Sequence, residues 1–483
     1  MKLLRHLAGY LPVNIASGVA AFGGVYVFTR LLGADEYGRY ALMFSVMTLV
    51  HMLSLTAAEA ASFRFAGEAE AKKSQPDHFR TTLSLTVRSM IVAALLIGAL
   101  AFALRKLPEY LEILPWIALL VPINSLIQMA LEAHRASERV GRYALVSTTR
   151  ILGGFLLGAL IAWQTGFGAA SPFIGMAIAG VFWGFSETRW LVQQAKGGVT
   201  DPGRRRAYLM YGAPIAAALV LDLVLSAADR FLVVAFLGEA AVGEYAAGYG
   251  VADKSVLLIC AWAAMAAAPL VMAAYERGGA EAAAEESRGL IRTLLLLGVP
   301  AATGLALVAT PLSEALIGEA VREGARQIIP WIAFAGLLNG LIIHYYSEVF
   351  NLTHRTGELA LLMLIPALSN IGLNLILIPQ FALLGAVIAT LASYALGLAV
   401  LATRGHRLIA LPMPLADLVK VSLAAAAMAP VIWALPALGG WPELFLKIAV
   451  GGTIYGLVAF MLDAGGARGF VRDRLASRGQ VSA

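Results

Sequence analysis

Apolar segments that are long enough to cross a lipid bilayer as helices fill most of this chain of 483 residues. A membrane-spanning helix needs about 20 predominantly apolar residues. Hydrophobic residues make up 60% of the sequence and charged residues 14%, whereas soluble domains contain about 25% charged residues. The sequence therefore predicts an all-α polytopic membrane protein with about 14 transmembrane helices. They lie near residues 9–32, 38–62, 80–104, 110–132, 142–163, 169–192, 208–237, 243–272, 290–317, 327–350, 358–379, 382–403, 416–438 and 443–463.

Part of the first half of the sequence returns in the second half. Residues 32–41 read LGxxxxGxYA, and the same pattern returns at residues 237–246, offset by 205 positions. Residues 115–118 read PWIA and return at residues 330–333, offset by 215. Six predicted helices, an even number, separate the two copies, so both copies have the same orientation in the membrane. We therefore expect two six-helix lobes related by an axis along the membrane normal, as in many transporters.

The predicted domains follow from this duplication. Helices 1–6 form an N-lobe and helices 7–12 a C-lobe, and a Gly- and Arg-rich cytoplasmic linker joins them. Two additional helices and a basic cytoplasmic tail complete the chain. The boundaries are 1–192 for the N-lobe, 193–207 for the linker, 208–404 for the C-lobe, 405–463 for helices 13 and 14, and 464–483 for the tail.

The distribution of Lys and Arg predicts the topology. With a cytoplasmic N-terminus, most of the 36 Lys and Arg residues fall on the cytoplasmic side, in agreement with the positive-inside rule. Both termini are then cytoplasmic. The basic residues follow the ends of apolar segments and form no single stripe, so the net charge of +6 does not indicate binding of nucleic acid.

These features resemble the polysaccharide transporter family, which comprises the O-antigen and exopolysaccharide repeat-unit flippases of the multidrug/oligosaccharidyl-lipid/polysaccharide exporter superfamily. The resemblance rests on the plan of six, six and two helices, on LGxxxxGxYA at the outer turn of each lobe, and on RxG at residues 139–141 and 355–357. It covers nearly the whole chain.

The resemblance implies a protein of the bacterial inner membrane that works by alternating access. Its expected cargo is an undecaprenyl-pyrophosphate-linked oligosaccharide, which moves from the cytoplasmic to the periplasmic leaflet for O-antigen, capsule or exopolysaccharide biosynthesis. Membrane lipid, a polysaccharide polymerase and assembly proteins are the further partners that it implies.

Four of the basic side chains inside the apolar segments are functional candidates, because an ionisable group is costly there. Arg88 and Arg150 lie about two turns into their helices from the cytoplasmic side, while Arg230 and Lys254 lie on helices 7 and 8. Because arginine binds phosphate oxygens bidentately, these four residues are the predicted pyrophosphate site. Arg88 has an alternative interpretation, in which its long side chain reaches the membrane interface.

Three aspartates also lie in predicted helices 7 and 8. Asp229 and Asp253 stand beside Arg230 and Lys254, so interhelical ion pairs are an alternative to headgroup binding. Asp222 lies two helical turns before Asp229, near the middle of the bilayer. It is a candidate for proton or sodium coupling, and its alternative is a neutral acid that is hydrogen-bonded to another helix.

Polar pairs on helices 10 and 11 are further candidates for ion coupling or for the cavity lining. His344 and Glu348 are four residues apart on one face, and so are Asn370 and Asn374. The first pair could relay protons, and the second pair could bind sugar hydroxyls or a sodium ion. Both pairs also suit simple helix–helix contacts. His51, alone in helix 2, is expected to be structural.

Sequence motifs for ATP hydrolysis are missing, because no Gly-x4-Gly-Lys-Ser/Thr loop occurs. No metal or cofactor motif is evident either. The energy is therefore expected to come from an ion gradient, with Na+ or H+ as the candidate ions, from the membrane potential or from substrate flow, and no enzymatic activity is expected. The alternative function is a cation-coupled multidrug or small-molecule exporter of the same superfamily. A scaffold for polysaccharide assembly and a membrane-embedded enzyme are less favoured.

Overall fold

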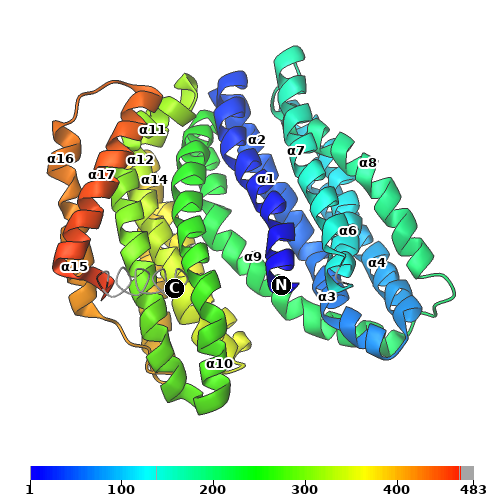
Figure 1. The fold of residues 1–483 in the computed structure, drawn as a ribbon. Helices are drawn as coiled ribbons and strands as arrows, with labels where there is room; N and C mark the ends of the chain where they lie inside the picture. The colour runs from blue at the N-terminus through cyan, green and yellow to red at the C-terminus, as the bar shows by residue number, and fades with distance from the viewer. Residues whose placement is uncertain (1, 138, 467, 469–483) are drawn as a thin grey trace. The chain divides into compact units, whose positions relative to one another are not determined.

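The computed structural model describes residues 2–137, 139–466 and 468, and it leaves out the side chains of residues 2–10, 222 and 266. All regular secondary structure in this part of the chain is helical, without a strand, which confirms the predicted all-α class (Figure 1). The predicted basic tail lies outside the described residues from position 469 onward.

The helices follow one another with short connections. The first half of the chain forms α1 (Lys2–Leu31), α2 (Ala34–Ser54), α3 (Thr56–Ala71), α4 (Gln75–Ala103), α5 (Pro108–Leu111), α6 (Leu114–Ala136), α7 (Val140–Gln164), the 3-10 segment η1 (Gly168–Ala170), α8 (Ser171–Gln194) and α9 (Pro202–Leu237). The second half forms α10 (Glu239–Leu307), α11 (Ala309–Leu316), α12 (Glu319–Leu341), the π-helical segment η2 (Ile342–Tyr346), α13 (Ser347–Leu352), α14 (Thr356–His406), α15 (Leu415–Ala426), α16 (Met428–Ala434), α17 (Gly440–Leu462) and the 3-10 segment η3 (Ala464–Gly466).

Ten of the described helical segments are long and apolar enough to cross a membrane, or eleven if the bent pair α2 and α3 is one span. The chain is therefore a multi-pass membrane protein. The predicted number of fourteen helices is not confirmed. The predicted number of helices and the number of observed elements are not directly comparable, because α10 and α14, the two longest elements, each contain a break that divides them into two helical parts.

The breaks in α10 and α14 reverse the direction of the chain. The backbone leaves helical geometry at Gly279, with φ 66°, and at Ala382, with φ 49°. A Cβ added to Gly385 would lie 2.2 Å from the carbonyl oxygen of Leu377. Residues eight positions apart in one straight helix are about 12 Å apart, so the second part of α14 folds back on the first.

Packing divides the chain into two compact units, residues 1–243 and 244–483. In unit 1, α7 packs on α1 and α8, α6 packs on α8, and α9 packs on α2 and α3. In unit 2, α12 packs on α14, and α17 packs on α11, α15 and α16. The predicted lobes are defined by duplication and the units by contacts, so the lobe boundaries at 192 and 208 remain a prediction.

The linker between α8 and α9 is anchored within unit 1. The backbone N–H of Val199 donates to Oδ1 of Asp77 at 2.8 Å. A Cβ added to Gly198 would come within 2.1 Å of the carbonyl oxygen of Pro76, so the backbone there lies directly against the start of α4. Asp201 then caps α9 by accepting from the N–H of Gly203 at 2.8 Å.

Apolar and polar side chains are distributed as expected for a protein that is surrounded by lipid. Phe182 and Phe185 on α8 are 71% and 73% exposed. Small and polar side chains, in contrast, lie inside the helix bundles, among them Thr82, Ser125 and Asn370. Small and hydrogen-bonding residues are typical of helix interfaces in membranes, so these side chains fit a role in helix packing.

Candidate functional site

Arg150 is the best-defined cation inside the helices of unit 1. Its Nη1 donates to Oδ1 of Asn124 on α6 at 2.9 Å, and Glu59 on α3 interacts with it electrostatically. The Nε of Arg150 is buried and has no hydrogen-bond partner among the described residues. Because a guanidinium carries five N–H donors, Arg150 retains donors for an anionic ligand.

Glu59 also contacts a histidine across the bend between α2 and α3. These two helices meet at Leu55 with an angle of 55°, and Nε2 of His51 lies 3.1 Å from Oε1 of Glu59. His51 was expected to be a lone structural residue, but its partner is an acid that is 9% exposed. The sequence could have indicated Glu59, because it is an acid inside a predicted span.

Arg230 lies in a different environment from Arg150. Its Nη1 donates to Oγ of Ser45 on α2 at 2.7 Å. It also interacts electrostatically with the phenol groups of Tyr37 and Tyr40 on the same helix. Arg230 therefore joins α9 to α2 in unit 1.

The other predicted charged residues are spread over both units. Arg88 is exposed on α4 and Asp229 is fully buried on α9, both in unit 1. In unit 2, Asp253 is buried on α10 and Lys254 is exposed beside it. Asp222 belongs to α9, but its side chain lies outside the described part of the structure.

The predicted His344–Glu348 pair falls at an irregular point of its helix. Residues 342–346 form a π-helical segment, which changes the angular spacing of the side chains around it. His344 is half-buried and makes no hydrogen bond to a described residue, while Glu348 accepts from Nδ2 of Asn351 at 3.2 Å. π-Helical bulges are frequent at functional sites, so this segment stays a candidate.

Asn370 and Asn374 form a fully buried pair on α14. Nδ2 of Asn374 donates to the backbone oxygen of Asn370 at 2.8 Å and to its Oδ1 at 3.1 Å. Elsewhere on α14, Thr390 lies 3.3 Å from the hydroxyl of Tyr245. The two amides are thus part of the buried polar interior of unit 2, and their role in ion coupling or in lining a cavity stays a prediction.

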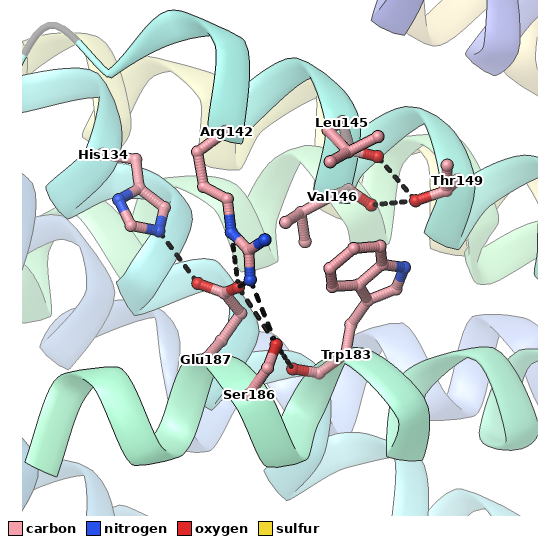
Figure 2. Close-up of polar contacts among 8 residues, drawn as sticks. All are labelled: His134, Arg142, Leu145, Val146, Thr149, Trp183, Ser186 and Glu187. Carbon is pink, nitrogen blue, oxygen red and sulfur yellow. Dashed lines mark hydrogen bonds and ion pairs between the residues drawn. The ribbon is translucent and has the colours of Figure 1, made fainter.

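A buried ionic cluster at the Arg-rich ends of α6, α7 and α8 was missed by the sequence analysis. Figure 2 shows Glu187 between His134 and Arg142: Nε2 of His134 lies 2.9 Å from one carboxylate oxygen, and Arg142 donates to the other. Ser186 completes the cluster. Glu187 is 1% exposed and His134 2%, so the cluster links the three helices through buried charged groups.

A second cluster joins α2 to the turn after α9. Arg39 donates to Glu36 at 2.8 Å and to Glu239 at 2.7 Å, and the hydroxyl of Tyr110 donates to Glu239 at 2.6 Å. The two LGxxxxGxYA copies meet here, because a Cβ on Gly38 would lie 1.9 Å from the carbonyl oxygen of Glu239. The repeated motif thus supplies both sides of one contact.

No group of three or more His, Cys, Asp or Glu side chains in the described residues is arranged to hold a metal ion. The buried groups are instead guanidinium, carboxylate, amide and hydroxyl groups within apolar helical bundles. Such groups bind polar or anionic ligands through hydrogen bonds and charge. This combination defines a polytopic membrane protein with polar and charged groups inside its helix bundles.

Residues 27–324, more than half of the chain, match the family described as "Polysaccharide biosynthesis protein". The chain belongs to this family, in agreement with the resemblance found in the sequence. No curated protein matches the chain.

Two solved structures show the fold. The lipid II flippase MurJ in an inward closed conformation is 16% identical with a TM-score of 0.69, and the match covers 93% of this chain and 98% of that chain. An inward-facing multidrug resistance MATE family transporter of the MOP superfamily is 13% identical with a TM-score of 0.64, and the match covers 82% of this chain and 94% of that chain. The chain therefore shares its fold with these two proteins.

Proposed function

We propose that this protein is a flippase that moves an undecaprenyl-pyrophosphate-linked oligosaccharide across the bacterial inner membrane by alternating access. Membership of a polysaccharide biosynthesis family and the fold shared with a lipid II flippase support this function. In this proposal both termini lie in the cytoplasm, which the distribution of Lys and Arg supports. The product serves polysaccharide biosynthesis, with O-antigen, capsule and exopolysaccharide as the candidate polymers.

The main support for the proposal is that the guanidinium of Arg150 lies among the helices without a hydrogen-bonded carboxylate from the described part of the chain. A buried guanidinium without a carboxylate hydrogen-bonded to it is costly, and Arg150 is instead held by the neutral amide of Asn124. A diphosphate brought against the free Nε of Arg150 would supply the missing acceptor. In this proposal Arg88, Arg230 and Lys254 also contact the anionic headgroup, one after another during transport.

Cation coupling belongs to the same proposal. Asn370 and Asn374 offer amide oxygens, and Asp222, Asp229, Asp253, His344 and Glu348 offer titratable or coordinating groups for Na+ or H+. We propose no enzymatic step, because translocation of an intact lipid-linked sugar breaks no covalent bond.

The test of Arg150 is a binding measurement with detergent-purified protein and undecaprenyl diphosphate. Loss of a charge-assisted hydrogen bond amounts to about 1.5–3 kcal/mol, so Arg150→Ala should weaken binding by about 10- to 150-fold. Arg206→Gln, which removes an exposed arginine of α9, is the matched control and should leave binding unchanged. Equal affinity of Arg150→Ala and wild type would remove Arg150 from the site.

A cation-coupled multidrug exporter is the second candidate. The TM-score of 0.64 to a multidrug resistance transporter favours it. Binding of cationic dyes by a protein that does not bind undecaprenyl diphosphate would support this function over the first.

A further inference from the structure

An apolar groove on the surface of unit 1 is not used by the proposed transport mechanism. It lies between α6 and α8 and has a volume of about 430 Å³, which is within the range of about 300–1,000 Å³ for ligand sites. Ile123, Val181, Gly184 and Phe185 line it, and Thr188 and Arg189 stand at one end. Gly184 lets Ile123 of α6 approach α8 closely at the floor of the groove, because an added Cβ would lie only 3.0 Å from Cγ2 of Ile123.

The groove opens toward lipid. Figure 1 places α8 at the edge of unit 1, apart from α9, and α8 packs on α4, α6 and α7. Val181 and Phe185 are 47% and 73% exposed. Exposed apolar side chains of a membrane-spanning helix face the hydrocarbon core, so a lipid chain has direct access to the groove.

The polar end of the groove carries an uncompensated positive charge. Arg189 is exposed and forms no hydrogen bond or ion pair with another described residue. The nearby acids already have partners, since Glu187 binds His134 and Arg142 (Figure 2). Likewise, Glu132 binds Arg135. The guanidinium of Arg189 is thus left to an anion from outside the protein.

This end of α8 also has the depth of a cytoplasmic headgroup. Arg135, Arg139 and Arg142 lie at the same ends of α6 and α7, which the positive-inside rule assigns to the cytoplasm. The eight residue steps from Val181 to Arg189 span about 12 Å of helix, close to half of the hydrocarbon thickness of about 30 Å. A lipid with its phosphate at Arg189 would therefore extend its chain to about the bilayer centre.

We propose that this groove binds an anionic phospholipid of the cytoplasmic leaflet. The phosphate lies on the guanidinium of Arg189 and the hydroxyl of Thr188, and one acyl chain lies along Ile123 and Phe185. Basic pockets between membrane helices on the cytoplasmic side recognise phospholipid headgroups in this way. A phospholipid fits better than the proposed cargo, because a single arginine at a short, outward-facing groove matches one phosphate and one acyl chain. The proposal does not depend on the transported substrate.

Native mass spectrometry of the purified protein with equal amounts of phosphatidylglycerol and phosphatidylcholine tests whether the charge of Arg189 selects an anionic lipid. Wild type should retain phosphatidylglycerol preferentially. Arg189→Gln should lower this retention by about fivefold, the factor for about 1 kcal/mol per basic residue at an anionic surface. Arg206→Gln removes an equal charge outside the groove and should retain the preference. Equal retention by wild type and Arg189→Gln, or an equal loss in both variants, would overturn the proposal.

Photolabelling tests the position and the identity of the lipid. Phosphatidylglycerol with a photoreactive acyl chain should form adducts within residues 181–189 of the wild-type protein. Adducts confined to other helices would overturn the proposal. Displacement of the label from this segment by an equimolar amount of undecaprenyl diphosphate would assign the groove to the cargo and would also overturn it, whereas undiminished labelling would support it.

Discussion

At the scale of single residues, the glycines of the repeated LGxxxxGxYA motif have different physical roles. Gly238 has φ 89°, a conformation that favours glycine, whereas the matching Gly33 has φ −62°. Gly38 needs its missing side chain for another reason, since the backbone of Glu239 and Gly243 lies against it. The repeat marks these positions, but only tertiary contacts distinguish backbone conformation from close packing.

Gly38→Ala should destabilise unit 1. The added Cβ would lie 1.9 Å from the carbonyl oxygen of Glu239, and overpacking of this kind costs about 1–3 kcal/mol. The midpoint of thermal unfolding in detergent should fall accordingly. Gly98→Ala, at a helical glycine with no atom within 4 Å of the added Cβ, is the control and should keep the wild-type midpoint or raise it. An unchanged midpoint for Gly38→Ala would mean that the motif copies do not pack closely.

At the scale of elements, apolar segment length locates helices well and their interruptions poorly. The segments predicted near 169–192 and 443–463 correspond to α8 (Ser171–Gln194) and α17 (Gly440–Leu462). The segment near 38–62 is broken at Leu55, without a proline or glycine to mark the bend. That bend brings His51 to Glu59. Local composition does not predict this contact, because the contact depends on the angle at which α2 and α3 meet.

The cluster around Glu187 gives a test of helix packing. Glu187→Gln removes the charge that holds His134 and Arg142 (Figure 2). Leaving buried hydrogen-bonding groups poorly satisfied costs about 1–3 kcal/mol, so the midpoint of thermal unfolding should fall. Glu68→Gln breaks an exposed pair with Lys72 and should change stability by less than about 1 kcal/mol. Equal stability of Glu187→Gln and wild type would show that the cluster does not link α6, α7 and α8.

At the scale of the whole molecule, composition predicts the membrane class, and the resemblance carried by the repeated motifs indicates the family. The predicted site is less well determined by sequence. Arg150 and Arg230 contact different residues within unit 1, and Lys254 belongs to unit 2. Depth along a helix can be estimated from residue number, but the partner of a buried charge depends on helix rotation and bends. For this reason Asn124 and Glu59 were not identified as the neighbours of Arg150.

Transport of the lipid-linked sugar by the purified protein tests the central proposal most directly. The protein is reconstituted in liposomes that carry a fluorescent undecaprenyl-pyrophosphate oligosaccharide in the inner leaflet, and its arrival in the outer leaflet is followed with and without Na+ and H+ gradients. A flippase predicts flux above that of protein-free liposomes, and dependence on one gradient would identify the coupling ion. Absence of this flux in folded protein that transports cationic dyes would contradict the proposal and support the multidrug exporter.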